Sequence, residues 1–149
     1  MKHYFLIVVV IVMGCSSRKT NDVLESNSKI NFFTNQADFI FDNILEDRKA
    51  FSSYSADDLS YRVQLKNLNH DIFLVEKKKI MIENGWLFLK KYNQSYIYCH
   101  GDDQLEIIVP RAIAMNDKLV NGSTGMQLED QWNIMFAHPK NSTWFECNK

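Results

Sequence analysis

The sequence has 149 residues, with 17 basic and 18 acidic side chains and a formal net charge of −1. Such a balance argues against a nucleic-acid partner, because binding to nucleic acid depends on clustered cations that neutralise phosphates. The length is enough for one domain with a real core and too short for two.

The first residues have the order of a bacterial export signal. Lys2 is followed by an uncharged run, Tyr4 to Met13, which is too short to span a bilayer because a span needs about 20 apolar residues. The run ends in Val12-Met13-Gly14-Cys15, which resembles the lipobox of bacterial lipoproteins. The resemblance implies that residues 1–14 are a signal peptide and that Cys15 carries acyl chains such as palmitate. An ordinary secretory signal and a short membrane anchor are the alternatives.

The residues after the cysteine predict a location and a tether. In the sorting rule of the lipoprotein family, Asp after the cysteine favours the inner membrane, and Ser16 stands there instead. The resemblance therefore implies an outer-membrane lipoprotein that faces the periplasm. Ser16 to Lys29 is mostly polar without helical periodicity, and it predicts a flexible tether with a reach of about 20 Å. We expect the lipidated cysteine and tether to occupy residues 15–30 and a single globular domain to occupy residues 31–149.

The first predicted element is a helix from Asn35 to Phe51, with Thr34 or Asn35 as its N-cap. Its apolar residues recur at i, i+3, i+4, i+7 and i+8, which is one helical face: Ala37, Ile40, Phe41, Ile44 and Leu45. Alternation of apolar and polar residues then predicts a strand from Leu59 to Lys66, and Ile72 to Val75 is a second short strand.

Lys79 to His100 predicts three antiparallel strands joined by two-residue turns. Asn84-Gly85 favours a type I′ hairpin because both residues tolerate positive φ, and Asn93-Gln94 is the second turn. Pairing outward from the turns gives two apolar faces, since side chains alternate with period two. One face, which we expect the helix to cover, carries Ile80, Ile82, Leu87 and Leu89. The other face carries Met81, Trp86 and Phe88, with Cys99 beside Phe88 and Tyr98 beside Leu89.

The rest of the chain predicts further strands, at Gln104 to Val109, Ala112 to Met115, Gln131 to Ala137 and Thr143 to Asn148. The first of these ends at Pro110, which cannot donate to a central ladder. Residues 116–129 are poorly patterned and predict a mobile or functional loop. One helix followed by short strands predicts an α+β domain, with the N-terminal helix packed on an antiparallel meander sheet. A small β-sandwich or barrel with a helix is the alternative.

Two cysteines remain once Cys15 is assigned to the lipid. In an oxidising compartment, Cys99 and Cys147 predict a disulfide that ties the meander to the C-terminal strand. Closing that loop is worth about 4 kcal/mol in the chain-entropy model. Free catalytic thiols are the alternative.

Cys99-His100-Gly101-Asp102-Asp103 is the densest group of potential metal-binding or catalytic side chains. It lacks a second half at zinc-like spacing, and Cys99 and His100 are strand neighbours whose side chains point to opposite faces. Gly122-Ser123-Thr124-Gly125 lacks the strand-to-helix setting of a nucleophile elbow. The sequence thus predicts no metal, no cofactor and no enzymatic activity.

Aromatic side chains on strands mostly belong to the core, but the helix can cover only one face of the meander. We therefore expect the other face to leave a partner-binding patch of Met81, Trp86 and Phe88, with Lys79 and Lys90 in its rim. An apolar patch with a charged rim is the anatomy of a protein-binding surface.

These observations predict a periplasm-facing lipoprotein that binds a protein, as an immunity protein or inhibitor against an envelope-directed toxin or hydrolase. The spacing of Tyr98-Cys99 and Cys147 is similar to that of membrane-bound lysozyme inhibitors, which are small β-barrel lipoproteins with a disulfide. The helical N-terminal part departs from that family, and its inhibitory loop is not matched residue by residue. The alternatives are a structural accessory of a secretion or envelope-assembly complex, and a small enzyme or ligand carrier.

Overall fold

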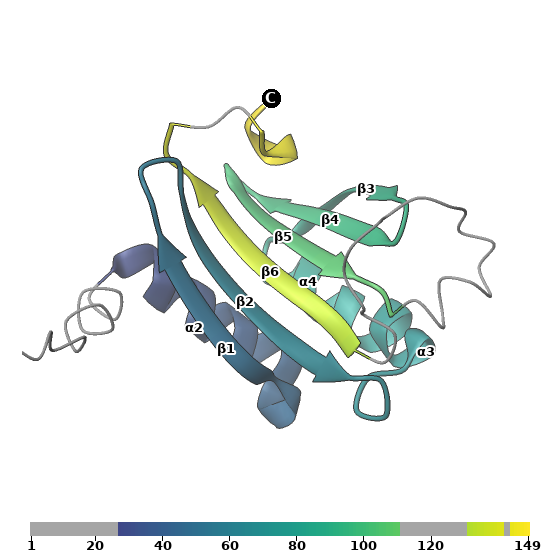
Figure 1. The fold of residues 1–149 in the computed structure, drawn as a ribbon. Helices are drawn as coiled ribbons and strands as arrows, with labels where there is room; N and C mark the ends of the chain where they lie inside the picture. The colour runs from purple at the N-terminus through teal and green to yellow at the C-terminus, as the bar shows by residue number, and fades with distance from the viewer. Residues whose placement is uncertain (1–26, 111–130, 142–143) are drawn as a thin grey trace, which may run out of the picture.

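The computed structural model describes residues 27–110, 131–141 and 144–149. Several predictions lie outside the described residues: the signal peptide, the acylated Cys15, most of the tether, the strand at Ala112 to Met115 and the loop at 116–129. The described residues form one antiparallel sheet with helices packed against one of its faces (Figure 1).

Helix α2 spans Ser28–Phe41, and its N-cap is Asn27, whose side chain accepts hydrogen bonds from the backbone N–H groups of Lys29 and Ile30. Its buried residues recur at helical spacing and form one face: Ile30, Phe33, Ala37, Ile40 and Phe41. The predicted apolar stripe is thus confirmed as far as Phe41. The predicted bounds are wrong, because the helix begins within the segment assigned to the tether and ends where Asp42 adopts a φ of 54°.

The helix was predicted to continue as far as Phe51. The residues after α2 instead form a short 3₁₀ turn and an edge strand. The 3₁₀ turn η1 spans Asp42–Ile44, and strand β1 spans Glu46–Ser52. Ile44 and Leu45 still pack against the core as the helical pattern required. The pattern could not separate these alternatives, because two apolar neighbours satisfy a helical stripe and a connection into a strand equally well.

Five more strands complete the sheet: β2 (Ala56–Gln64), β3 (Leu87–Tyr92), β4 (Ser95–His100), β5 (Asp103–Ile108) and β6 (Gln131–Pro139). Their order is β1-β2-β6-β5-β4-β3, and every neighbouring pair is antiparallel. The strands predicted at Leu59 to Lys66, Gln104 to Val109 and Gln131 to Ala137 are confirmed with small changes in their bounds.

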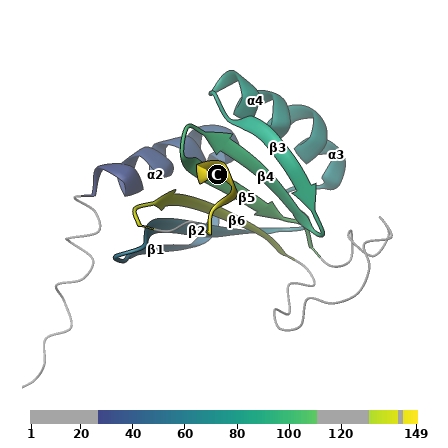
Figure 2. The ribbon, with the colours of Figure 1, turned by 90° about the horizontal axis from the view of Figure 1, so that it is seen from above.

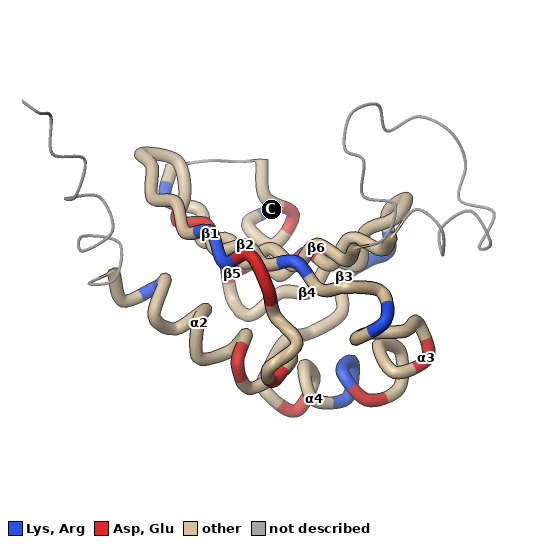
Figure 3. The backbone as a smooth tube through the Cα atoms, turned by 60° about the horizontal axis from the view of Figure 1, so that its bottom comes forward, with Lys and Arg blue, Asp and Glu red and all other residues tan. Residues whose placement is uncertain are grey.

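The sheet is open in the part of the chain that the structure describes, with β1 at one edge and β3 at the other. Helices α2, α3 and α4 lie on one side of it, and the C-terminal turn lies on the other side (Figures 2 and 3). The protein is therefore an α+β domain with its N-terminal helix packed on an antiparallel sheet, as predicted, and the six described strands do not close into a barrel.

The segment from His70 to Glu83 is helical, where two strands were predicted. It consists of α3 (His70–Ile72), the π-helical turn η2 (Phe73–Lys77) and α4 (Lys78–Glu83). Phe73, Lys77 and Met81 are its buried residues, and their spacing of four is a helical period. The alternating reading of this segment was wrong because these positions, and not the exposed Ile82 and Val75, face the core.

Asn84-Gly85 ends this helix and does not form a hairpin. The N–H of Gly85 donates to the carbonyl of Ile82, and the N–H of Trp86 donates to the carbonyl of Met81, which is the hydrogen-bond pattern of a Schellman motif. Gly85 has a φ of +84°, and a Cβ there would lie 3.1 Å from His100 Cδ2. A helix end and a type I′ hairpin both need positive φ, so the dipeptide alone cannot distinguish them.

The second predicted turn, Asn93-Gln94, is confirmed, since Tyr92 pairs with Ser95 across it and Lys90 pairs with Ile97. A bulge between Phe88 and Lys90 then shifts the register by one residue. Phe88 consequently pairs with Tyr98, and Leu87 pairs with Cys99. The predicted neighbours of Phe88 and Leu89 are therefore wrong.

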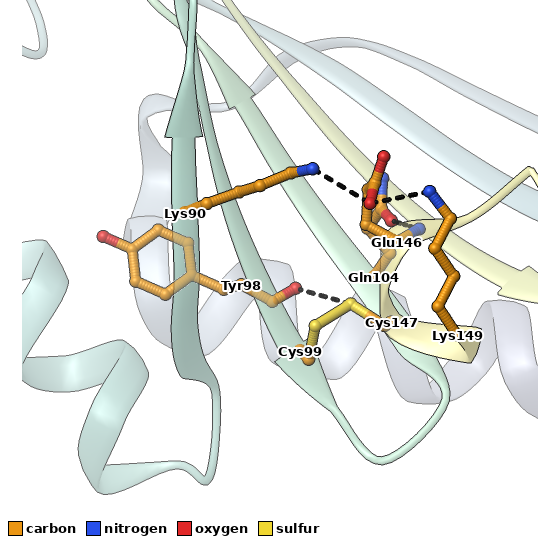
Figure 4. The surroundings of a disulfide bond; sticks show 7 residues. All are labelled: Lys90, Tyr98, Cys99, Gln104, Glu146, Cys147 and Lys149. Carbon is orange, nitrogen blue, oxygen red and sulfur yellow. Dashed lines mark hydrogen bonds and ion pairs between the residues drawn. A yellow bond between two sulfur atoms is a disulfide. The ribbon is translucent and has the colours of Figure 1, made fainter.

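The C-terminal residues Glu146–Asn148 form a 3₁₀ turn, η3, where a strand was predicted. The predicted disulfide between Cys99 and Cys147 is present and fixes this turn against β4 (Figure 4). The core lies between the helices and the sheet, and its largest side chains include Trp86, Trp132, Tyr98, Phe33 and Phe136.

Candidate functional site

The predicted partner-binding residues separate into a buried pair and an exposed group. Met81 and Trp86 are completely buried, so their assignment to a binding surface is wrong. Met81 lies on the inner side of α4. Trp86 precedes β3, packs edge-on against Phe136, and donates from Nε1 to Gln36 Oε1 at 2.9 Å. Trp86 therefore belongs to the core, as aromatic side chains on strands mostly do. The other three predicted residues, Phe88, Lys79 and Lys90, are at the surface.

Strand β3 carries the largest group of exposed apolar side chains on one described element. We define the β3 surface as Leu87, Phe88, Leu89 and Tyr92, which are 65%, 44%, 47% and 64% exposed. Leu87 and Leu89 were expected to lie under the helix, and Phe88 was expected to share a face with Trp86. They are exposed because β3 is the last strand in the sheet order and has a neighbouring described strand on one edge alone.

The β3 surface is apolar on both sides of the sheet. Phe88 faces the helices, where its ring lies edge-on to Tyr98 at a centroid distance of 5.4 Å, with Lys78 Nζ 5.4 Å above it. Leu87 pairs with Cys99 and so lies on the side of the disulfide. Only β4 pairs with β3 among the described strands, so the other backbone edge of β3 faces away from the sheet.

Lysine side chains border the β3 surface. Lys78 covers Phe88, Lys91 Nζ lies 4.9 Å from the ring centre of Tyr96, and Lys79 is within 3.8 Å of Glu83. Lys90 Nζ lies 2.9 Å from Glu146 Oε2. The border of the surface is therefore predominantly basic, although the whole chain is nearly neutral.

The disulfide holds the acidic member of this border in place. Glu146 belongs to the turn that Cys147 attaches to β4, and its backbone N–H donates to Gln104 Oε1 at 2.8 Å. Hydrogen bonds from Lys149 and Lys90 hold the pKa of Glu146 below its ordinary value. Figure 4 shows these side chains around the disulfide. The C-terminal turn thus fixes the position of Lys90 beside the β3 surface.

A second polar cluster lies where α2 begins. Its Asp103 and His100 belong to the densest group of potentially catalytic side chains in the sequence, but Lys29 and His138 were not predicted to join them. Asp103 is buried; Lys29 Nζ lies 3.0 and 3.1 Å from its two carboxylate oxygens, and His138 Nδ1 lies 2.7 Å from Oδ1. The cluster lines a pocket that also includes Ser28, Phe32 and His100. Asp103 and His138 are distant in sequence, and only the pairing of β5 with β6 brings them together.

A buried carboxylate that orients a histidine is also found in catalytic triads. Here Lys29 bonds both carboxylate oxygens, so the negative charge is already balanced by an ion pair. Within residues 27–110, 131–141 and 144–149, His138 has no hydrogen bond to a hydroxyl group, and the two cysteines are joined to each other. The polar contacts of the cluster join α2 to β5 and β6.

The same described residues offer neither a metal-binding cluster nor a membrane-spanning helix. They contain no group of three or more His, Cys, Asp or Glu side chains that could hold a metal ion. None of their helices has the length and apolar character needed to cross a bilayer.

Comparison of the chain with protein-family models, with curated proteins and with solved structures finds no match. The β3 surface is therefore characterised by its own geometry: an open strand edge, apolar on both sides, with a basic border.

Proposed function

We propose that the protein is a lipoprotein, anchored through Cys15 and facing the periplasm, whose β3 surface binds a protein partner. The function most compatible with this arrangement is that of an immunity protein or inhibitor against an envelope-directed toxin or hydrolase. The observation that carries the proposal is the β3 edge, which exposes four large apolar side chains and an open backbone edge.

An edge of this kind is a template for another strand. Its open N–H and C=O groups pair readily with an added chain, and natural proteins usually protect such edges with charge or cover. When a partner adds a strand, the main-chain hydrogen bonds provide affinity and the alternating side chains provide specificity. Leu87 and Phe88 would contact such a strand from opposite sides of the sheet.

The lysines around the edge favour an acidic partner segment over a second copy of this chain. Two copies that paired through β3 would each bring Lys90 and Lys91 to the shared edge, and like charges that come close across paired strands are destabilising. An extended segment with acidic and apolar residues matches both the apolar surface and its border.

A photo-crosslinking amino acid placed at Leu87 in the full-length protein in cells tests the proposal. Val75 is the matched control, because it is 70% exposed but lies on η2 and not on β3. We expect the probe at position 87, and not the probe at 75, to capture one protein, whose toxic or hydrolytic activity falls when the lipoprotein is added.

Variants then connect the contact to the activity. Leu87→Asp should weaken inhibition about 10- to 100-fold, as expected for an anchor residue at an interface, whereas Val75→Asp should leave it unchanged. Capture of only envelope-assembly or secretion subunits would favour the structural accessory. Absence of capture from β3 in a properly acylated protein would refute the assigned surface. Unchanged acyl labelling after Cys15→Ser would refute the anchor.

A further inference from the structure

Three exposed aromatic side chains gather at the end of the sheet opposite the β3–β4 turn. They are Phe51 near the end of β1, Tyr54 in the turn between β1 and β2, and Trp144 before the C-terminal turn, and they are 62%, 83% and 89% exposed. We name them the aromatic end. They account for most of the strongly exposed aromatic surface that the β3 surface does not include.

Several contacts place these residues at the same end of the molecule. The β1–β2 turn is closed by a hydrogen bond from Ser53 N–H to the Ala56 carbonyl, and Asn141 Nδ2 donates to the Tyr54 carbonyl at 3.1 Å. The chain continues from Asn141 towards Trp144 and then to the turn that is linked to Cys99 at the β4–β5 end. Figure 1 shows the β1–β2 turn, the end of β6 and the C-terminus at one end of the sheet.

Helix α2 begins at this end too. Lys29 in its first turn bonds to Asp103 at the start of β5, and Asn27 is a hydrogen-bond partner of Asp57 near the start of β2. The chain that precedes Asn27 leads, twelve residues earlier, to Cys15. A chain of that length spans at most about 40 Å even when it is fully extended.

We propose that the aromatic end contacts the lipid surface to which Cys15 is attached, so that the domain is held in a fixed orientation. This inference rests on the lipid anchor of the proposed function. Trp and Tyr favour the headgroup region, where an apolar ring and a polar tip are both accommodated. A short tether also gives an effective concentration in the millimolar range, so a contact that is weak by itself becomes populated.

The charges near the aromatic end specify the kind of contact. Lys140 Nζ lies 2.6 Å from Asp57, and Lys29 is paired with Asp103. These cations are already neutralised, so the contact depends on the aromatic rings and not on attraction to anionic lipids. Phe51 and Tyr54 belong to the β1 edge of the sheet, opposite β3, so their contact with lipid leaves the outer backbone edge of β3 open.

Tryptophan fluorescence of the full-length acylated protein in vesicles tests this orientation. Trp86 and Trp132 are completely buried, so Trp144 is the exposed reporter among the three tryptophans of the chain. In phosphatidylcholine vesicles whose acyl chains carry bromine, we expect the Trp144 emission to shift to the blue and to be quenched. Trp144→Phe should lose this response, and addition of phosphatidylglycerol should leave it unchanged.

A double variant and a matched control separate the contact from the anchor. Phe51→Ser with Tyr54→Ser should abolish most of the quenching, whereas Phe39→Ser, which removes an exposed ring from α2, should not change it. Retained acylation with unquenched Trp144 would overturn the inference and leave the anchor intact. A spectral shift that follows protein density and not bromine would indicate a second copy and would also overturn it. Loss of acyl labelling would refute the anchor itself.

Discussion

The two edge strands of the sheet differ in chemistry. β1 begins with Glu46, Asp47, Arg48 and Lys49, and its pairing with β2 is interrupted by a bulge where Asp47 has a φ of 51° (Figure 3). β3 begins with Leu87, Phe88 and Leu89. Charges and bulges prevent edge strands from pairing with other chains. β3 also has a bulge, between Phe88 and Lys90, and it carries two lysines. It nevertheless retains the exposed apolar side chains that a partner strand requires, whereas the first half of β1 is charged.

The two edges are also held to the sheet by different interactions. β1 uses exposed polar contacts: Gln64 Nε2 donates to Glu46 at 2.9 Å, and Arg62 lies 3.5 Å from Asp47. β3 is held by burial of the preceding Trp86, by Phe88, and by the ion pair of Lys90 with Glu146, which lies in the turn that the disulfide joins to β4. We expect opening of β1 to respond to pH, and opening of β3 to respond to core packing and reduction.

We expect the largest loss of stability when the apolar contacts that hold β3 to the core are removed. Trp86→Ala removes a completely buried indole and leaves Gln36 without its donor, so it should lower the free energy of unfolding by about 3–5 kcal/mol. Urea denaturation measures this change. Phe51→Ala on β1 is the matched control and should change stability by less than about 0.5 kcal/mol, because its ring is mostly exposed. Equal losses in the two variants would contradict the comparison.

The next effect is loss of the disulfide. Cys99→Ser with Cys147→Ser opens a loop with a sequence separation of 48 residues and should cost about 2–4 kcal/mol. Hydrogen exchange should accelerate in β3 and β4 more than in β1. The reduced wild-type protein is the control and should behave like the double variant. Mass spectrometry without reductant that found two free thiols would exclude this stabilisation.

The sequence predicted the sheet better where strands have one buried face than where the chain changes direction. Leu59, Tyr61 and Val63 alternate in β2, and Trp132, Ile134 and Phe136 alternate in β6, because one face of each strand is buried in the core. Alternation of apolar and polar residues with a period of two identifies such strands in a sequence. The edge strand β1 carries no such pattern, because it buries almost nothing, and it was read as part of the helix.

The sequence predicted only part of the candidate site, because one dipeptide was assigned to the wrong kind of turn. Phe88, Lys79 and Lys90 were placed at the surface from the meander, but Asn84-Gly85 assigned Met81 and Trp86 to the wrong element. The exposed backbone edge of β3 depends on the sheet order β1-β2-β6-β5-β4-β3. That order is set by contacts between β2, β5 and β6, which no local pattern contains.

We expect a smaller loss of stability when a polar contact that holds β1 to β2 is removed. The Asp57 carboxyl is buried; burial raises its pKa, but hydrogen bonds from Lys140, Ser52 and Asn27 outweigh this effect and hold the pKa below the ordinary value of 3.8. A carboxyl with a lowered pKa stabilises the fold above its unfolded-state pKa and loses that contribution as the pH falls through its folded-state pKa. Asp57→Asn should therefore cost about 1.5–3 kcal/mol at neutral pH, with the difference from wild type disappearing as the pH is lowered below about 4.

Asp58 provides the control for Asp57→Asn, because its pKa is shifted in the opposite direction. Burial and the neighbouring charge of Asp57 raise the pKa of Asp58, so its ionised form reduces stability at neutral pH. Asp58→Asn should leave the protein as stable as wild type or more stable at neutral pH, and this difference should shrink on acidification. Urea denaturation across the pH range measures both variants, and the same sign for both would contradict the assignment.

The most direct test of the comparison gives β3 a charged side chain and β1 an apolar one. We expect these two substitutions to have the smallest effect on stability. Leu87→Lys on β3 and Lys49→Leu on β1 both change exposed side chains, so each should alter the free energy of unfolding by no more than about 0.5 kcal/mol. Their self-association in sedimentation velocity should differ: Lys49→Leu should raise it, because it removes a charge from the edge, and Leu87→Lys, which adds a charge, should not. If Lys49→Leu left the protein monomeric, the bulge at Asp47 rather than charge would be what protects β1, since the bulge twists the strand away from a flat edge.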